Sequence, residues 1–180
     1  MGNIPSLCIN AVRLSYNNDM LRVLFVCMGN ICRSPSAEGV FLKLVADSGL
    51  SRRVEVRSAG THDYHVGGPS DPRSHEAASR RGVHLSHHRA QQVQAEDFKR
   101  YDYILAMDRV NMERLLQLCP AEHAHKVRLF LEFADASPDE EVPDPYYGGP
   151  NGFEHVLNLI ELASGGLLAD IRQNLIHKGH

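Results

Sequence analysis

The stretch Val23-Leu-Phe-Val-Cys27-Met-Gly-Asn-Ile-Cys32-Arg33-Ser34-Pro35 indicates both the fold of this chain and the place of its reactive site. Leu21 to Val26 is apolar and contains β-branched and aromatic residues, which is typical of a buried strand. Gly29-Asn30 interrupts that strand with two residue types that tolerate positive φ. Ser34 to Glu38 then has the Ser, Pro and Glu of a helix start. The sequence therefore predicts a strand, a short loop and a helix in direct succession.

This loop is a predicted anion site. In such a loop several backbone N–H groups point to one spot, and the helix dipole adds positive potential there. Cys27 ends the strand, and Arg33 follows after five intervening residues. A thiol reacts as its thiolate, which a helix N-terminus and a guanidinium favour, and the planar fork of arginine matches two phosphate oxygens. The pattern predicts phosphoryl transfer through a cysteinyl-phosphate, whereas the alternative is a buried cysteine beside an arginine that only pairs with an acid.

The residues Cys27-Met-Gly-Asn-Ile-Cys32-Arg33-Ser34-Pro35 resemble the active-site loop of the low-molecular-weight protein-tyrosine-phosphatases. The resemblance extends over nearly everything from Met20 to the C-terminus. It implies hydrolysis of phosphotyrosine in proteins, and of small aryl phosphates, with Cys27 as the nucleophile and Arg33 as a ligand of the phosphate. It also implies that the other loop residues bind phosphate or support the loop, namely Met28, Gly29, Asn30, Ile31, Cys32 and Ser34.

A second motif, Val142-Pro143-Asp144-Pro145-Tyr146-Tyr147, contains the candidate proton donor. Prolines on either side of Asp144 stiffen the backbone and limit where its carboxyl can point. A departing phenol needs a general acid, which typically contributes ~10²- to 10⁴-fold in rate. The phosphatase family has its general acid in a similar Asp-Pro-Tyr loop, so the resemblance implies this role for Asp144. Without the cysteine loop, an acid between prolines is usually only a turn former.

The resemblance also implies residues that support the loop. Ser34 could donate its hydroxyl to the Cys27 sulfur, could cap the helix, or could do both. We expect a left-handed conformation at Asn30, which the family anchors through a histidine, here His88 or, as a second choice, His87. The family commonly has Ala-Arg-Gln where this chain has Ala90-Gln91-Gln92, so the alignment of this segment stays open.

Aromatic side chains are expected to form the walls of the substrate pocket. Tyr64 matches a family position with an aromatic wall residue, and Tyr146 and Tyr147 would line the opposite wall. Deep aromatic walls suit a phenyl phosphate and keep the shorter phosphoserine away from the thiolate, which predicts selectivity for phosphotyrosine. The two adjacent tyrosines are also candidate targets of a kinase.

Cysteine and histidine suggest two further chemistries. Cys32 could form a reversible disulfide with Cys27, which in some family members protects the nucleophile from over-oxidation; otherwise it is an inert small residue. Zinc binding by histidines is disfavoured, because no cysteine or acid completes a tetrahedral set nearby, and we expect neither metal nor cofactor. The histidines with suitable spacing are His84, His87 and His88, His62 and His65, and His123 and His125.

The rest of the chain predicts an α/β fold. The expected strands are 21–26, 54–60, 101–107 and 126–131, and the expected helices are 37–49, 72–82, 95–99, 108–118 and 152–176, the last with a possible break at Gly165-Gly166. Residues 61–71 and 135–150 are expected to be loops, the second one exposed. This alternation predicts a three-layer sandwich, in which a four-stranded parallel twisted sheet has helices on both faces, as in the phosphotyrosine phosphatase I-like fold of the family. Ligands bind at the carboxyl ends of such strands, where Cys27 lies.

The composition fits one globular domain. The chain has 180 residues, 43% of them hydrophobic, and a net charge of −3, which gives no reason to expect nucleic acid as a partner. We expect residues 1–20 to be an N-terminal extension and residues 21–180 to be the phosphatase domain. No run is long and apolar enough to span a membrane, and the segment 1–19 is a poor signal peptide.

The N-terminus and the cysteines bear on the compartment. Met1 to Ser6 formally fits an N-myristoylation pattern at Gly2, which we discount because so short a pattern is common by chance. The cysteines have neither zinc-ribbon spacing nor the density of a secreted scaffold, so we expect a reducing cytoplasm and no membrane partner. They are Cys8, Cys27, Cys32 and Cys119.

Two other functions fit the sequence less well. A thiol-dependent arsenate reductase uses a similar loop and fold, but it needs further cysteines to pass a disulfide on, and only Cys119 remains downstream. A phosphate-binding module without activity would be expected to lack Cys27, Arg33 or Asp144, and all three are present. The sequence therefore favours a phosphatase.

Overall fold

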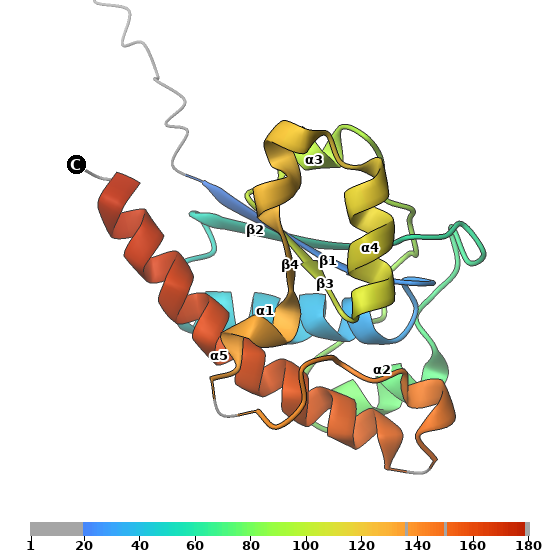
Figure 1. Cartoon of the computed structure of the whole chain (residues 1–180). Coiled ribbons are helices and arrows are strands. Elements are labelled where there is room, and N and C mark those ends of the chain that lie inside the picture. Colours follow the sequence, from blue (N-terminus) through green and yellow to red (C-terminus); the bar gives the residue numbers. More distant parts are fainter. Residues whose placement is uncertain (1–19, 136, 150, 179–180) are drawn as a thin grey trace, which may run out of the picture.

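The computed structural model describes residues 20–135, 137–149 and 151–178 (Figure 1). The N-myristoylation pattern at Gly2 and the thiol of Cys8 lie outside the described residues. The strands are β1 (Leu21–Cys27), β2 (Val54–Gly60), β3 (Tyr103–Ala106) and β4 (Val127–Leu129). The α-helices are α1 (Arg33–Asp47), α2 (Pro72–Ser79), α3 (Asp97–Arg100), α4 (Arg109–Leu118) and α5 (Gly152–Lys178), and the 3-10 helices are η1 (Ala121–Lys126), η2 (Phe130–Phe133) and η3 (Pro145–Tyr147).

The four strands form one parallel sheet in the order β2-β1-β3-β4, which confirms the predicted fold class. Strand β1 lies inside the sheet, pairing with β2 from Leu21–Val54 to Cys27–Gly60 and with β3 on its other side. A parallel strand covered on both faces needs apolar residues at nearly every position, as β1 has. Because β1 ends at Cys27, the thiol lies at the carboxyl edge of the sheet.

Helices cover both faces of the sheet. Figure 1 shows α1, α2 and α5 on one side and α3 and α4 on the other. Alternate side chains of β1 enter two separate cores, so that Phe25 packs with α1 and α5, whereas Leu24 packs with α3 and α4. The ring of Phe25 meets the rings of Phe41 and Phe130 edge to face, with centroids 5.8 and 4.8 Å apart. No described helix is long and apolar enough to cross a membrane.

Several element boundaries differ from the prediction. Strand β4 stops at Leu129, where the Glu132 carboxylate accepts a hydrogen bond from the Leu129 N–H and η2 begins, so a strand to residue 131 was wrong. Helix α2 ends at Ser79, ahead of Gly82 with its φ of 71°. On α4 the apolar side chain of Val110 is exposed, whereas that of Leu115 is buried.

The segment 135–150 was predicted to be an exposed loop without regular structure, which is only partly correct. Val142 is fully buried, its N–H donates to the Met107 carbonyl, and the buried Pro145 begins the turn η3. Hydropathy alone gave no sign of this, because the apolar residue stands among acids and prolines. The loop is therefore anchored to the end of β3.

The possible break at Gly165-Gly166 does not occur, since α5 is continuous. Gly166 packs directly on the backbone of η2, where a Cβ would collide with the Phe133 carbonyl oxygen, whereas a Cβ on Gly165 would meet nothing within 4 Å. Glycine at position 166 therefore allows two backbones to approach closely.

These two neighbouring glycines provide a matched pair of substitutions. Gly165→Ala should increase the free energy of unfolding by up to about 1 kcal/mol, because alanine is the better helix former. Gly166→Ala should decrease it by about 1–3 kcal/mol or more, because a methyl group is forced into a packed contact. Urea unfolding followed by circular dichroism measures both, and equal effects of the two substitutions would contradict the packing role of Gly166.

Candidate active site

The loop between β1 and α1 is shaped by Asn30, the non-glycine residue with positive φ (54°) in the described chain. This residue is fully buried. Its side-chain N–H groups donate to the hydroxyls of Ser34 and Ser58, both at 2.9 Å, and its side-chain oxygen accepts from the Gln91 N–H at 2.9 Å. Its main-chain carbonyl accepts from His88 Nε2 at 2.7 Å. The left-handed conformation is as predicted, and His88 is the histidine that contacts it, whereas His87 is exposed.

The loop rests on the end of β2. The N–H of Thr61 donates to the Cys27 carbonyl at 2.9 Å, and the N–H of His62 donates to the Met28 carbonyl at 3.1 Å. A Cβ at Gly60 would lie only 2.7 Å from the Met28 carbonyl oxygen. Glycine is therefore required where β2 meets the loop, a constraint that the sequence analysis missed.

Cys27 is buried, with its sulfur 3.0 Å from the Ser34 hydroxyl oxygen. Helix α1 begins at Arg33, and Cys32 occupies the N-cap position without a side-chain hydrogen bond. Ser34 therefore lies in the first turn, and the alternative that it caps the helix is wrong. Its hydroxyl instead connects the sulfur to the Ala59 carbonyl at 3.3 Å and to Asn30.

Glu38 extends this set of hydrogen bonds behind the loop. The Ser58 hydroxyl donates to its carboxylate at 2.5 Å while accepting from Asn30. Burial raises the pKa of Glu38 above its ordinary value, although the bond from Ser58 opposes this shift. A continuous line of side-chain contacts thus runs from Glu38 through Ser58, Asn30 and Ser34 to the thiol.

Arg33 has only 5% of its side chain exposed, and acidic or carbonyl oxygens surround its guanidinium. NH1 donates to Asp108 Oδ2 at 2.5 Å and to the Val142 carbonyl at 3.1 Å, and NH2 lies 3.8 Å from Asp144 Oδ2. Burial alone would lower the pKa of Arg33, but the negative charges of Cys27 and Asp108 outweigh it and raise the pKa. The guanidinium therefore keeps its charge at the site.

Asp108 is a site residue that the sequence analysis identified only as a helix start. It does cap α4 by accepting from the Asn111 N–H at 2.7 Å, and its other carboxylate oxygen holds Arg33. A signal was present, because Asp108 follows β3 and lies at the same carboxyl edge of the sheet as Cys27. Arg33 is indeed paired with an acid, as the alternative interpretation expected, yet it also lines a cavity over the loop.

A cavity of about 350 Å³ opens over this loop and brings the predicted residues together. The predicted residues that line it are Cys27, Met28, Gly29, Ile31, Cys32, Arg33, Tyr64, Asp144, Tyr146 and Tyr147. Asn30, Ser34 and His88 do not line it and lie behind the loop, where they hold its backbone. His65 and Asp71 line the cavity as well and were missed, because a long loop brings them there.

The second thiol at the site differs from the first in its surroundings. Burial raises the pKa of Cys32 to about 12, so this sulfur stays protonated at neutral pH. Cys27 and Cys32 are both free thiols in this structure, and a disulfide between them stays a prediction. Within the described residues no group of three His, Cys, Asp or Glu side chains is arranged to hold a metal ion.

This arrangement defines a class of site. A buried thiol at the N-terminus of a helix, beside a charged guanidinium and below a carboxylate, can bind an oxyanion and attack it. The class is that of enzymes that transfer a phosphoryl group through cysteine.

Comparison with known proteins identifies the family. A family model described as low molecular weight phosphotyrosine protein phosphatase matches residues 22–177. A low molecular weight protein-tyrosine-phosphatase of Streptomyces coelicolor is 47% identical over 157 residues, which are 86% of this chain and 95% of that protein. The crystal structure of a protein tyrosine phosphatase from Entamoeba histolytica, with Hepes in its active site, has a TM-score of 0.83 at 38% identity over 86% of this chain and 98% of that one. The crystal structure of YfkJ from Bacillus subtilis also has a TM-score of 0.83, at 37% identity, and the match covers 88% of this chain and 98% of that one.

This chain belongs to the family of low molecular weight phosphotyrosine protein phosphatases. The resemblance inferred from the cysteine loop is thereby confirmed.

The histidine behind the loop should make stability depend on pH. The pKa of His88 is lowered, first because burial disfavours its charged form, and also because Arg89 is near, although the bond to Asn30 opposes this. A base whose folded-state pKa is below the ordinary value of about 6.5 contributes stability that is complete above that pH and is lost as the pH falls through the lowered pKa. The wild-type protein should therefore lose this stability on acidification.

His88→Gln removes the titrating group but keeps an N–H that can donate to the Asn30 carbonyl. The difference in unfolding free energy between wild type and this variant should shrink as the pH is lowered from ~7.5 to ~5. Denaturant unfolding at several pH values measures it, with the exposed His87→Gln as control. A difference that stays constant with pH would contradict the shifted pKa.

Proposed function

We propose that Cys27, Arg33 and Asp144 carry out the reaction of this protein-tyrosine-phosphatase, with phosphotyrosine in proteins as its substrate. The family hydrolyses phosphotyrosine through a cysteine, and this chain has the corresponding loop. The single observation that carries the assignment is that a buried thiol, a charged guanidinium and a carboxylate line one cavity at the start of α1.

In the proposed first step the Cys27 thiolate attacks the phosphorus atom. The bond between sulfur and phosphorus forms as the bond to the phenolic oxygen breaks. The guanidinium of Arg33 and the loop N–H groups bind the three other phosphate oxygens, where charge accumulates. The Asp144 carboxyl gives its proton to the departing phenolate oxygen, so that a neutral tyrosine leaves.

In the second step water replaces the enzyme at phosphorus. The Asp144 carboxylate takes a proton from a water molecule, whose oxygen attacks the phosphorus of the cysteinyl-phosphate. The bond between phosphorus and sulfur breaks, inorganic phosphate leaves and the thiolate is restored. The Ser34 hydroxyl, 3.0 Å from the sulfur, stabilises the thiolate as the leaving group of this step.

The surroundings of Arg33 support its proposed role as a phosphate ligand that is held in a fixed orientation. Asp108 and the Val142 carbonyl bind the same guanidinium nitrogen, NH1, which leaves other N–H groups for the phosphate. A preorganised donor costs no rearrangement when charge develops in the transition state. Asp108 is thus proposed to position Arg33.

The cavity walls support selectivity for an aryl phosphate. Tyr64 is 69% exposed and is backed by a stacked His62 ring, with centroids 5.0 Å apart. Tyr146 and Tyr147 line the same cavity. A phenyl ring can lie between such walls while its phosphate reaches the sulfur, whereas phosphoserine is too short. A thiolate nucleophile further fits the reducing cytoplasm as the working compartment.

Replacement of the nucleophile tests the assignment of Cys27. Cys27→Ser should reduce turnover of p-nitrophenyl phosphate on the order of 10⁴-fold or more, because a hydroxyl at this position lacks the reactivity of a thiolate. Binding of inorganic phosphate, followed by calorimetry, should stay nearly intact. Cys119→Ser is the matched control and should keep turnover of this substrate. Full activity of Cys27→Ser would end the proposal.

Replacement of the proton donor tests the assignment of Asp144. Asp144→Ala should lower kcat/KM for phenyl phosphate by ~10²- to 10⁴-fold, because phenolate leaves poorly without a proton. The loss should be much smaller for p-nitrophenyl phosphate, whose leaving group is stable as an anion. Asp139→Ala, in the same loop, is the control. Equal losses for both substrates would argue against proton donation by Asp144.

A further inference from the structure

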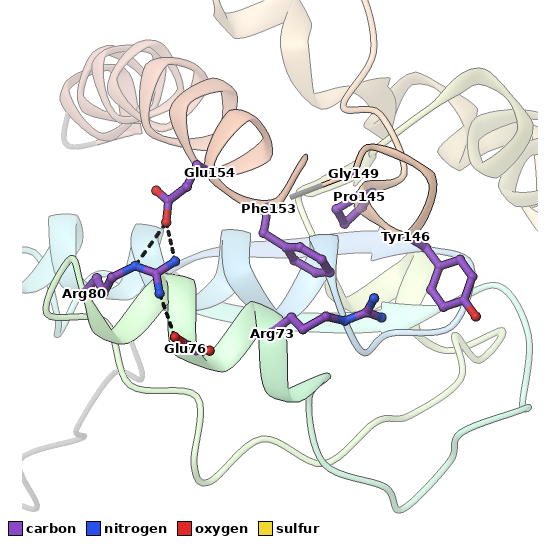
Figure 2. Close-up of a pocket in the computed structure, with 8 residues that line it drawn as sticks. All are labelled: Arg73, Glu76, Arg80, Pro145, Tyr146, Gly149, Phe153 and Glu154. Atoms are coloured by element: carbon purple, nitrogen blue, oxygen red, sulfur yellow. Dashed lines mark hydrogen bonds and ion pairs between the residues drawn. The ribbon is translucent and has the colours of Figure 1, made fainter. Parts of the chain in front are cut away.

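A second cavity, of about 440 Å³, lies beside the first one, between α2, η3 and the start of α5. Tyr146 lines both cavities. Figure 2 shows the side chains around it, with Arg73 in the first turn of α2 and Arg80 just past the end of that helix. The lining residues are Arg73, Glu76, Arg80, Pro145, Tyr146, Gly149, Phe153 and Glu154.

Arg73 connects α2 to the segment that carries Asp144. Its guanidinium lies between two rings, with its central carbon 5.2 Å from the ring centroid of Tyr146 and 4.9 Å from that of Phe153 (Figure 2). Cation–π contacts of this kind attract the rings to the charge. At its other edge the guanidinium donates two hydrogen bonds to the Asp71 carboxylate, from Nε to Oδ1 at 3.0 Å and from NH2 to Oδ2 at 2.8 Å. The side chain is therefore fixed in orientation.

Asp71 in turn belongs to the first cavity. It lines that cavity, and its N–H donates to the Ile31 carbonyl of the phosphate loop at 2.8 Å. The contact with Arg73 is the main reason why the pKa of Asp71 is lowered, so the carboxylate stays charged and keeps its partner. Arg73 thus binds Asp71, which is itself hydrogen-bonded to the loop between β1 and α1.

The carboxyl of Asp144 depends on the backbone of the next turn. Asp144 Oδ1 accepts a hydrogen bond from the Tyr146 N–H at 3.0 Å, while Oδ2 points to Arg33. A shift of Tyr146 would therefore rotate the carboxyl. The turn η3 also packs on α5, where a Cβ at Gly152 would lie 3.0 Å from the Pro145 carbonyl oxygen. The ring of Tyr146, the middle residue of this turn, lies against the guanidinium of Arg73.

We propose that Arg73 is a positioning residue for Asp144: by holding the Tyr146 ring against α2 it fixes the carboxyl over the phosphate loop. This inference rests on the proposed role of Asp144 as the proton donor. A displacement of a reacting group by 1 Å can cost on the order of 10²-fold in rate, so even a modest loosening of the turn should be measurable.

Arg80, the residue directly after the end of α2, provides a matched control. It binds Glu154 at 2.6 Å and Glu76 at 2.9 Å, both drawn in Figure 2. It thus connects α2 to α5 as Arg73 does, but none of its contacts among the described residues reaches η3. Loss of Arg80 should weaken the same packing without moving Asp144.

The test compares kcat/KM for phenyl phosphate, a poor leaving group, with that for p-nitrophenyl phosphate, a good one. Arg73→Met should lower the value by roughly 10-fold for phenyl phosphate and by no more than about 2-fold for p-nitrophenyl phosphate. Arg73→Lys keeps a positive charge near the rings but loses the paired hydrogen bonds to Asp71, so its kcat/KM for phenyl phosphate should lie between those of wild type and Arg73→Met. Arg80→Met should leave the ratio of the two values unchanged. A general loss of folded enzyme lowers both values equally and so cannot imitate the expected result.

A double-mutant cycle separates this inference from the proposed function. If Arg73 acts through Asp144, adding Arg73→Met to Asp144→Ala should change the rate with phenyl phosphate by no more than about 2-fold. The inference is overturned if the two losses multiply, if Arg73→Met affects both substrates equally, or if Arg80→Met reproduces the effect. The proposed function fails instead if Asp144→Ala alone shows no dependence on the leaving group.

Discussion

The site depends on one buried amide side chain in an unusual backbone conformation. Asn30 has a φ of 54°, which costs a non-glycine residue free energy, and it buries a polar group that would be costly without partners. Its side chain and carbonyl are bonded to α1, β2 and the segment 88–91. Removing such an amide would leave several buried partners unsatisfied, each at about 1–3 kcal/mol. The loop therefore has its shape before any phosphate binds.

A second constraint is the burial of a charge. The guanidinium of Arg33 is almost completely removed from water, which is unfavourable unless its N–H groups and charge are compensated. Asp108 and the Val142 carbonyl provide this compensation, and they come from the ends of β3 and from the loop that carries Asp144. The hydrogen bonds of Arg33 thus hold the loop that carries Asp144 close to the thiol of Cys27. Stability and activity share these contacts, because the same burial that demands a partner for Arg33 sets its orientation.

The unit of β1, loop and α1 could be predicted because its signals are local. A run of apolar residues, a residue that tolerates positive φ and a helix start follow each other within the stretch from Leu21 to Glu38. The motif around Asp144 was also visible, since prolines restrict its backbone. Asp108 and Gly60 were missed as site residues because their importance arises only from residues distant in sequence. The burial of Val142 and the continuity of α5 at Gly166 were mispredicted for the same reason.

The sequence by itself determined the reactive atoms and the order of strands and helices, since residue type fixes the chemistry of a thiol, a guanidinium and a carboxyl, and hydrophobic periodicity fixes the local elements. Only the tertiary structure decided which groups face each other. Asp108 and Asp71 became part of the site because the parallel sheet brings the carboxyl ends of its strands to one edge. Contacts of this kind depend on packing between segments far apart in the chain, which no local pattern encodes.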